Sequence, residues 1–331
     1  MMNKTNLRKF FALAALLLVF GAIAGILFFV EHELRTDTEP EKGALDIMRE
    51  KEVVYFNGEA YMPRTGVTSY LVIGLDTDGE MKSSGSYNNT AQSDFLLLLL
   101  MDRKEKRYTL LHLNRDTMTD IDQIDVRGQR AGTAYEQLAL AHTYGDGMQV
   151  SCENTVRAVS NLLYGVTIDH YLAMTLDAVP ILNDMLGGVT VTVPQDLTAV
   201  DPALREGAVV TLKGSQTEHF IRSRGSLADS SNLARMERQK VYLSALIQTV
   251  AEREMTDDFV NDVFERISPY VLTDGNLNAL SELSKQLTSY SLDRILSPEG
   301  EAVVGRDFME FYVDDDSLKT IVADLFYTRA D

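Results

Sequence analysis

The chain has 331 residues, of which 45% are apolar and 24% are charged, a composition that suits a folded globular protein. Its formal net charge of −18 argues against general nucleic-acid binding, because affinity for a duplex depends on neutralising phosphates. The single cysteine, Cys152, excludes an intramolecular disulfide, and we expect it to be a small buried residue.

Basic residues are scarce along most of the chain. Lys4, Arg8 and Lys9 precede the first acidic residue, and after residue 30 there are 28 basic and 49 acidic side chains, a net charge of −21. Several arginines that converge within so acidic a domain would therefore indicate a specific anionic ligand.

An uncharged apolar run of 21 residues extends from 10 to 30. As a helix it would be roughly 30 Å long, which matches the hydrocarbon core of a bilayer. Arg8 and Lys9 precede the run and Glu31 follows it. We therefore expect residues 1–9 to be a cytoplasmic tail and 10–30 a single transmembrane anchor, with the remaining chain extracellular at the cell membrane.

A cleaved signal peptide is the alternative for this segment. Ala22-Ile23-Ala24 resembles the small residues of a cleavage site, but the apolar run continues beyond Gly25. The continuous length favours an uncleaved anchor.

Two further parts follow the anchor. Residues 31–66 are polar and rich in charge, which indicates a juxtamembrane stalk with a short helix near 44–51 and a hairpin around Asn57-Gly58. From 67 to 331, signals for strands and helices alternate. That alternation predicts one extracellular domain of the α/β class (α-β-α type), with a central mixed β-sheet flanked by helices.

The clearest strands lie early in this domain. The run at 68–75 has the pattern of a buried strand, and the run at 95–101 is apolar on both faces, as in a central strand. A charged turn joins the second run to an antiparallel partner at 108–113. Further strands are predicted at 170–175, 189–193 and 310–313. Helices are predicted at 151–164, 177–186, 233–251, 256–271 and 276–290, and from residue 316.

Two acids lie at strand ends. Asp76 directly follows one hydrophobic strand, and Asp94 directly precedes the next. Two carboxylates on adjacent strands can bind a hard cation such as Mg²⁺ and leave positions open for phosphate oxygens. The alternative is that each aspartate only caps a turn.

Arginines form a second candidate group. Arg115 ends a strand, Arg222 and Arg224 would share a face if extended, and Arg235 and Arg238 would share a face at a helix start. Guanidinium groups bind phosphate in a bidentate fashion and stay charged. Ion pairs with neighbouring surface acids are the alternative.

Other known motifs fit less well. The segment around Asp76 and Asp78 resembles the Asp-x-Asp-Gly opening of a haloacid-dehalogenase-type phosphatase, but the later parts of that pattern are weak. An EF-hand loop from Asp76 would place Met81 where glycine is needed. The five histidines lack metal-ligand spacing, and no Walker loop is present.

The order of short motifs resembles the LytR-CpsA-Psr family of cell-wall ligases, over residues 67 to 331. The matching segments are Gly74-Leu75-Asp76, Ser93-Asp94, Asn114-Arg115-Asp116-Thr117, Ile168-Asp169-His170-Tyr171, Leu186-Gly187-Gly188-Val189, Leu212-Lys213-Gly214, Arg222-Ser223-Arg224 and Arg235-x-x-Arg238-Gln239.

Several positions depart from the family pattern. The family usually has Pro at the position of Asn114, Arg at that of Gln92 and Asp at that of Asn232. Asp229 could replace the missing acid, and Arg130 could replace a lysine that the family has after the Arg-Asp strand.

The resemblance implies transfer of an anionic glycopolymer, of teichoic-acid or capsule type, from a polyprenyl-pyrophosphate carrier to peptidoglycan by phosphoryl transfer. It implies Mg²⁺ held by Asp76 and Asp94. The residues that it implies for pyrophosphate binding are Arg115, Arg130, Arg222, Arg224, Arg235, Arg238 and Gln239.

Catalysis is expected to involve Arg115 with an acid as general base, for which Asp94, Asp116 and Asp229 are open candidates. The helices at 151–164 and 177–186 are candidate walls for a slot that takes the prenyl tail, and the favoured alternative is that their apolar faces pack as ordinary core. Two alternatives remain: a non-catalytic envelope regulator that binds polyprenyl lipid, and a phosphatase that forms an aspartyl-phosphate on Asp76.

Overall fold

The computed structural model describes residues 53–56, 58–223, 232–252, 256–275, 283, 286, 289–306 and 308–330. The predicted tail, the anchor at 10–30 and the helix near 44–51 lie outside these ranges, as does most of the helix predicted at 276–290. Within the described part of the chain, no helix combines the length and the apolar character that crossing a membrane requires.

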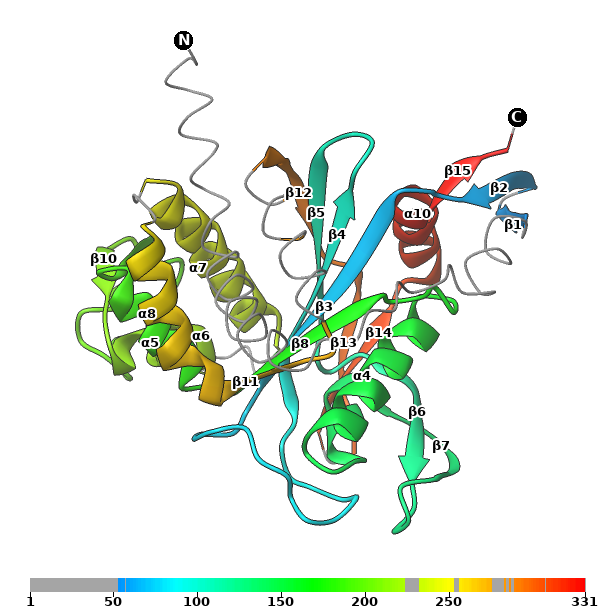
Figure 1. Ribbon diagram of the computed structural model, residues 1–331, viewed down its shortest axis with the longest axis horizontal. Coiled ribbons are helices and arrows are strands. Elements are labelled where there is room, and N and C mark those ends of the chain that lie inside the picture. Colours follow the sequence, from blue (N-terminus) through cyan, green and yellow to red (C-terminus); the bar gives the residue numbers. More distant parts are fainter. Residues whose placement is uncertain are drawn as a thin grey trace, which may run out of the picture.

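A six-stranded mixed sheet forms the centre of the molecule (Figure 1), in the order β11-β8-β3-β4-β5-β12. The central strands β3, β4 and β5 are antiparallel to one another, whereas β3 and β8, and β5 and β12, pair in parallel. The bounds are β3 Val67–Leu75, β4 Ser93–Asp102, β5 Arg107–Leu113, β8 His170–Met174, β11 Val271–Thr273 and β12 Ser291–Leu296.

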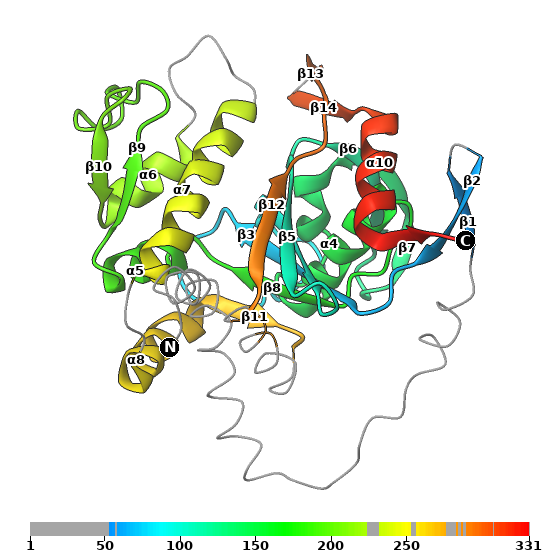
Figure 2. The same ribbon diagram turned by 90° about the horizontal axis from the view of Figure 1, so that it is seen from above.

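Helices cover both faces of this sheet (Figures 1 and 2). One face packs against α5 (Ala178–Met185), α7 (Leu233–Ala251) and α8 (Asp257–Ile267). The other packs against η1 (Leu138–Thr143), α4 (Gln149–Leu162) and α10 (Asp315–Phe326). Two buried apolar clusters result, and the predicted α-β-α arrangement is confirmed.

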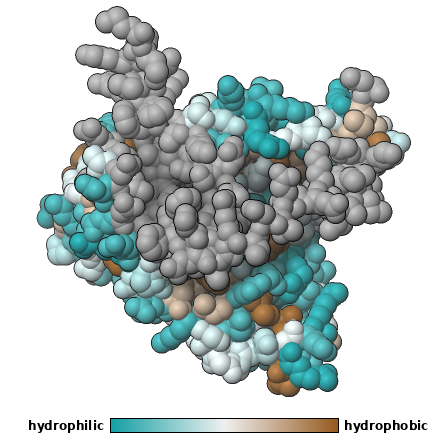
Figure 3. All heavy atoms as spheres, in the orientation of Figure 1, coloured by the Kyte–Doolittle hydropathy of each residue, from teal (hydrophilic) through white to brown (hydrophobic). Residues whose placement is uncertain are grey.

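Short elements surround the sheet. They are β1 Val54–Phe56, β2 Glu59–Pro63, β6 Met118–Ile124, β7 Arg130–Gln137, β9 Val189–Thr192, β10 Val209–Leu212, α6 Ser215–Arg222, η2 Ser268–Tyr270, β13 Gly300–Val304, β14 Met309–Val313 and β15 Tyr327–Arg329. Strands β1 and β2 form the hairpin predicted in the stalk, and β2 also pairs with β15 near the C-terminal end. On the face shown in Figure 3 the described surface is mostly hydrophilic.

Most predicted elements agree with the structure. The strands predicted at 68–75, 95–101 and 108–113 are β3, β4 and β5, and the helix predicted at 233–251 has the bounds of α7. The central strands were recognisable because a strand covered by helices on both faces is apolar at successive positions. Cys152 is fully buried, as expected.

Candidate functional site

The polar residues of the site lie at one edge of the central sheet. Because β4 is antiparallel to both β3 and β5, the end of β3, the beginning of β4 and the end of β5 meet there. Asp76 directly follows β3, Asp94 is the second residue of β4, and Arg115 comes two residues after β5. The predicted proximity of these side chains follows from strand pairing.

The carboxylate of Asp94 joins two arginines. The Arg115 guanidinium forms an ion pair with Oδ1, and Nη1 of Arg235 donates to Oδ2 over 3.1 Å. Arg115 and Arg235 are 7% and 4% exposed, so water screens this cluster little. One negative charge thus lies between two positive charges in a mostly buried position.

Further contacts orient Arg115. Its Nη2 donates to Oε1 of Gln92 over 2.8 Å, and its Nε donates to Oδ1 of Asp116 over 3.2 Å. The same Asp116 oxygen accepts from Nε2 of Gln137 over 2.9 Å. Asp116 therefore orients the guanidinium of Arg115. Asp116 itself lines neither the polar pocket nor the apolar cavity that are described below.

Two asparagines connect the beginning of α7 to the end of β5. Nδ2 of Asn232 donates to Oδ1 of Asn114 over 2.9 Å, and Oδ1 of Asn232 accepts from Nε of Arg235 over 2.6 Å. Oδ1 of Asn114 also accepts the backbone N–H of Asp116. Two of the departures from the family pattern therefore lie in direct contact and fix Arg235 relative to Arg115.

Arg238 connects α7 to the end of α6. Its guanidinium donates to three backbone carbonyls, those of Phe220, Ser223 and Ala234, and the residue is 1% exposed. Burial lowers the pKa of this guanidinium to about 10. Arg238 positions the last turn of α6, where Arg222 lies.

Asp94, Arg115 and Arg235 belong to the wall of a polar pocket of about 400 Å³. The pocket contains three arginines and three acids, from the sheet edge, α6 and α7. Its lining residues are Asp76, Gln92, Asp94, Arg115, Glu218, His219, Arg222, Ser223 and Arg235.

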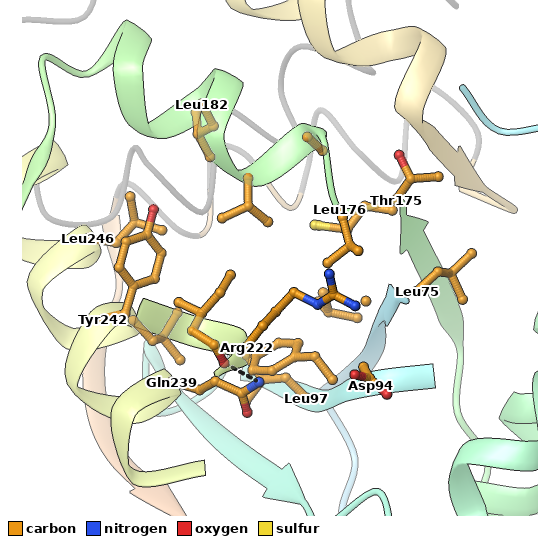
Figure 4. A pocket seen from close by; sticks show the side chains of 18 of the residues that line it. Leu75, Asp94, Leu97, Thr175, Leu176, Leu182, Arg222, Gln239, Tyr242 and Leu246 are labelled. Atoms are coloured by element: carbon orange, nitrogen blue, oxygen red, sulfur yellow. Dashed lines mark hydrogen bonds between the residues drawn. The ribbon is translucent and has the colours of Figure 1, made fainter. Parts of the chain in front are cut away.

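An apolar cavity of about 150 Å³ lies next to it, between the sheet and helices α5 and α7. Its wall includes Ala178 and Leu182 of α5 and Tyr242 and Leu246 of α7. Figure 4 shows Arg222 and Asp94 on one side of this cavity and Leu182, Tyr242 and Leu246 on the other.

Three residues line both spaces: Asp94, Arg222 and Arg235. The polar pocket and the apolar cavity are thus neighbours with a shared, charged boundary. Such an arrangement suits an amphiphile whose anionic head lies against guanidinium groups and whose hydrocarbon chain enters the cavity.

The structure brings together five of the predicted site residues. Asp76, Asp94, Arg115, Arg222 and Arg235 all line the polar pocket. Gln239 lines the apolar cavity instead, where its Nε2 lies 3.4 Å from the backbone oxygen of Ile221.

Arg130 does not lie at the site, in contrast to the prediction from the sequence. It lies on β7, 63% of its side chain is exposed, and its Nε pairs with Asp122 over 2.8 Å. Arg130 therefore does not line the polar pocket or the apolar cavity. Arg238 was also predicted to bind ligand, but its guanidinium donates hydrogen bonds to three backbone carbonyls and does not line the polar pocket.

One prediction about local structure also fails. Arg222 is the last residue of helix α6 and does not lie on the strand expected around it. Of the two candidate walls, α5 lines the cavity, whereas α4 packs as ordinary core on the opposite face of the sheet. Arg224 and Asp229 lie outside the described residues.

Sequence reasoning missed Glu218 and His219 of α6. In a helix, residues three and four positions before Arg222 share its face. That spacing would have indicated both residues had the segment been recognised as helical rather than extended.

A buried histidine lies beneath the site. His112 on β5 is 3% exposed, and its pKa is lowered to about 4, mainly by burial and further by the charge of Arg235. Its ring packs against Phe95, with ring centroids 4.9 Å apart. This histidine is therefore neutral and adds no positive charge near Arg235.

The donors in the pocket suit Mg²⁺ in kind, since Asp76 and Asp94 supply carboxylate oxygens. One oxygen of Asp76 accepts the Gln92 backbone N–H over 2.7 Å, and Asp94 would have to release an arginine to bind a metal. Within the described ranges no group of three or more His, Cys, Asp or Glu could hold an ion. If the two carboxylates bound Mg²⁺, its other coordination positions would be filled by oxygens of water and of the ligand.

Comparisons with known proteins show the family of the chain. A family model described as the LytR_cpsA_psr family matches residues 31–323. The polyisoprenyl-teichoic acid–peptidoglycan teichoic acid transferase TagT of Bacillus subtilis is 25% identical over 276 residues, which cover 80% of this chain and 79% of TagT. An uncharacterized protein of Staphylococcus aureus is 24% identical over 85% of this chain, which spans only 66% of that relative.

A solved structure shares the fold. The structure of TagT bound to LI-WTA has a TM-score of 0.57 with this one at 22% identity, over 79% of this chain and 90% of that chain. Because the family match extends over most of the sequence, the chain belongs to the LytR_cpsA_psr family.

Proposed function

We propose that this protein is a membrane-anchored transferase that moves an anionic glycopolymer from a polyprenyl-pyrophosphate carrier to peptidoglycan. One observation carries the proposal: a pocket with three arginines shares Asp94, Arg222 and Arg235 with an apolar cavity. Only an amphiphilic substrate uses both spaces at once. The name of the relative TagT, a teichoic acid transferase, supports this class of substrate.

The reaction fits the charges of the polar pocket. A hydroxyl of the acceptor attacks the sugar-linked phosphorus, and polyprenyl phosphate leaves with the electron pair of the broken P–O bond. Negative charge then increases on both phosphates, where Arg115, Arg222 and Arg235 can stabilise it. Because these groups are held in place before the reaction, little reorganisation is needed.

The prenyl chain would occupy the apolar cavity. Each methylene transferred from water contributes about 0.8 kcal/mol, so one isoprene unit contributes several kcal/mol of binding. Leu182, Tyr242 and Leu246 would contact the chain. The cavity would thereby hold the pyrophosphate at its charged boundary.

Mg²⁺ held by Asp76 and Asp94 would neutralise part of the phosphate charge. Asp116 orients Arg115 and is occupied by Gln137 as well, so we do not assign it as the base. Asp94 has a guanidinium on each oxygen, so its role is to hold Arg115 and Arg235 together when no metal is bound.

We also propose the topology that the sequence predicts. Residues 10–30 anchor the chain in the membrane, 1–9 lie in the cytoplasm, 31–66 form the juxtamembrane segment and 67–331 the extracellular catalytic domain. The uncharged apolar run between basic and acidic flanks supports this orientation.

The test is a reconstituted reaction. The full chain in detergent is mixed with Mg²⁺, peptidoglycan fragments and a polyprenyl-pyrophosphate glycan labelled in both sugar and lipid. A transferase gives glycan-linked peptidoglycan and polyprenyl monophosphate in equal amounts. Release of inorganic phosphate with a phosphorylated Asp76 would favour a phosphatase, and retention of unchanged lipid would favour a non-catalytic lipid binder.

A further inference from the structure

Helix α6 brings two titratable side chains into the polar pocket besides those that the family pattern predicts. Glu218, His219, Arg222 and Ser223 all line it. Glu218 forms an ion pair with Arg222 over 2.7 Å on the same helix. His219 has no such partner among the described residues, and its Nδ1 is buried without a hydrogen bond.

An imidazole nitrogen that is buried without a partner is unusual, because buried polar atoms are nearly always hydrogen-bonded. Because Nδ1 is buried, a group in the pocket cannot reach it. The other ring nitrogen, Nε2, is neither buried nor hydrogen-bonded among the described residues, and His219 lines the pocket, so a hydroxyl group that enters the pocket can donate its hydrogen to Nε2.

The proposed reaction needs a group that accepts a proton. The two oxygens of Asp94 are each engaged by an arginine, and Asp116 lies behind Arg115, outside the pocket wall. Glu218 is paired with Arg222. Histidine changes charge between about pH 5 and 8, which suits a general base at neutral pH.

We infer that His219 is the general base of the transfer, an inference that depends on the function proposed above. The neutral ring takes the proton of the acceptor hydroxyl while its oxygen forms a bond to the sugar-linked phosphorus. The bond from this phosphorus to the bridging oxygen breaks, and polyprenyl phosphate leaves with the electron pair. The imidazolium then releases its proton to water.

The charges around His219 come from several elements. Asp76, Asp94 and Arg115 face the pocket from the sheet edge, Arg235 from α7, and Glu218 and Arg222 from α6 itself. Asp201, which accepts from Gln216 of α6, also interacts electrostatically with His219. Both signs are present, so an imidazolium formed during the reaction finds acids nearby.

The experiment compares the full chain with His219→Gln and His219→Ala in the reconstituted transfer reaction from pH 5 to 9. We expect kcat to fall by about 10²–10⁴-fold in both variants, with KM for the lipid substrate within roughly twofold. We expect kcat of the unmodified chain to fall at acidic pH, and this fall should be absent from both variants. Added imidazole should restore part of the rate of His219→Ala but not of His219→Gln.

His170→Asn is the matched control, because His170 lies on β8 beside Asp274 and does not line either pocket. It should keep the rate and the pH profile of the unmodified chain. Thermal melting of His219→Ala checks that it folds, and rescue by imidazole would itself demonstrate a folded site.

An unchanged rate and pH profile in His219→Ala would overturn the assignment. A loss confined to KM, or a loss that imidazole does not rescue in a folded variant, would also overturn it. If the unmodified chain itself forms no product, the transferase proposal fails instead, which separates the two outcomes.

Discussion

Arg115 and Arg235 bind different oxygens of the same carboxylate, although they lie 120 positions apart in the sequence and on different elements. Without Asp94 between them, two buried guanidinium groups at this separation would repel each other. Asp94 therefore keeps two cations side by side in the wall of the polar pocket, and one of them, Arg235, also lines the apolar cavity.

Replacing Arg115 should abolish transfer while the fold is retained. We expect Arg115→Ala to lower kcat by at least about 10²-fold, because a preorganised charge stabiliser is lost. The free energy of unfolding should fall by about 3 kcal/mol, because Asp94 and Asp116 lose a buried partner. Transfer assays and urea denaturation measure the two effects. Normal glycopolymer attachment by folded Arg115→Ala would contradict the role given to this arginine.

Arg238 should matter for stability more than for binding. Arg238→Ala leaves three backbone carbonyls without their donor and creates a cavity, so we expect a loss of about 2–4 kcal/mol. Denaturation curves measure this loss.

Arg130→Ala provides the comparison, because Arg130 is mostly exposed and Asp122 keeps its second ion pair, with Arg157. We expect a change below about 1 kcal/mol and unchanged transfer. Equal stability losses in the two variants would contradict the distinction drawn between them.

Filling the apolar cavity should affect long prenyl chains selectively. Ala178 is 3% exposed and lines the cavity from α5, so the ring of Ala178→Phe should occupy it. We expect KM for a long-chain carrier to rise about tenfold or more, while a short-chain analogue is used as before. Equal effects on both substrates would place the prenyl chain elsewhere.

The central strands and α7 could be predicted because their patterns are local. A strand that is apolar at successive positions and a 19-residue amphipathic helix both follow from periodicity. Which face of the sheet a helix covers does not follow from periodicity. Periodicity therefore leaves open which of α4 and α5 lines the cavity, and it does not indicate the contribution of Tyr242 and Leu246 from α7.

The proximity of site residues could be predicted where strand pairing determines it. It could not be predicted where a side chain has several possible hydrogen-bond partners. Asp76, Asp94 and Arg115 meet because antiparallel pairing brings the strand ends together. Arg235 and Arg238 lie on one helix, three residues apart, yet one faces the pocket and the other faces backbone carbonyls of α6. Only the packing of α6 against α7 decides between them.

Stability should depend on pH through two buried histidines. Burial is the main reason that the pKa values of His112 and His142 are lowered to about 4 from 6.5. The unfolded chain therefore binds more protons between pH 4 and 6.5, so stability is complete above about pH 6.5 and falls as the pH decreases toward 4. Each histidine should contribute about 3 kcal/mol to this fall.

Denaturant titrations at several pH values measure this dependence. Carboxylates also titrate in the lower part of the range, so the comparison is with His142→Asn, which should show a smaller slope between pH 5 and 6.5. Parallel profiles for the two proteins would contradict the contribution of His142.

The most direct test of the shared charged boundary is a comparison of ligand affinities. Calorimetry with the full chain in detergent, in the presence of Mg²⁺, would compare a polyprenyl pyrophosphate with the corresponding alcohol, for the unmodified chain and for Arg222→Ala. We expect the pyrophosphate to bind at least about tenfold more tightly than the alcohol, which corresponds to about 1.4 kcal/mol, and Arg222→Ala to lose most of this preference. Equal affinity of the unmodified chain for the two ligands would contradict this expectation.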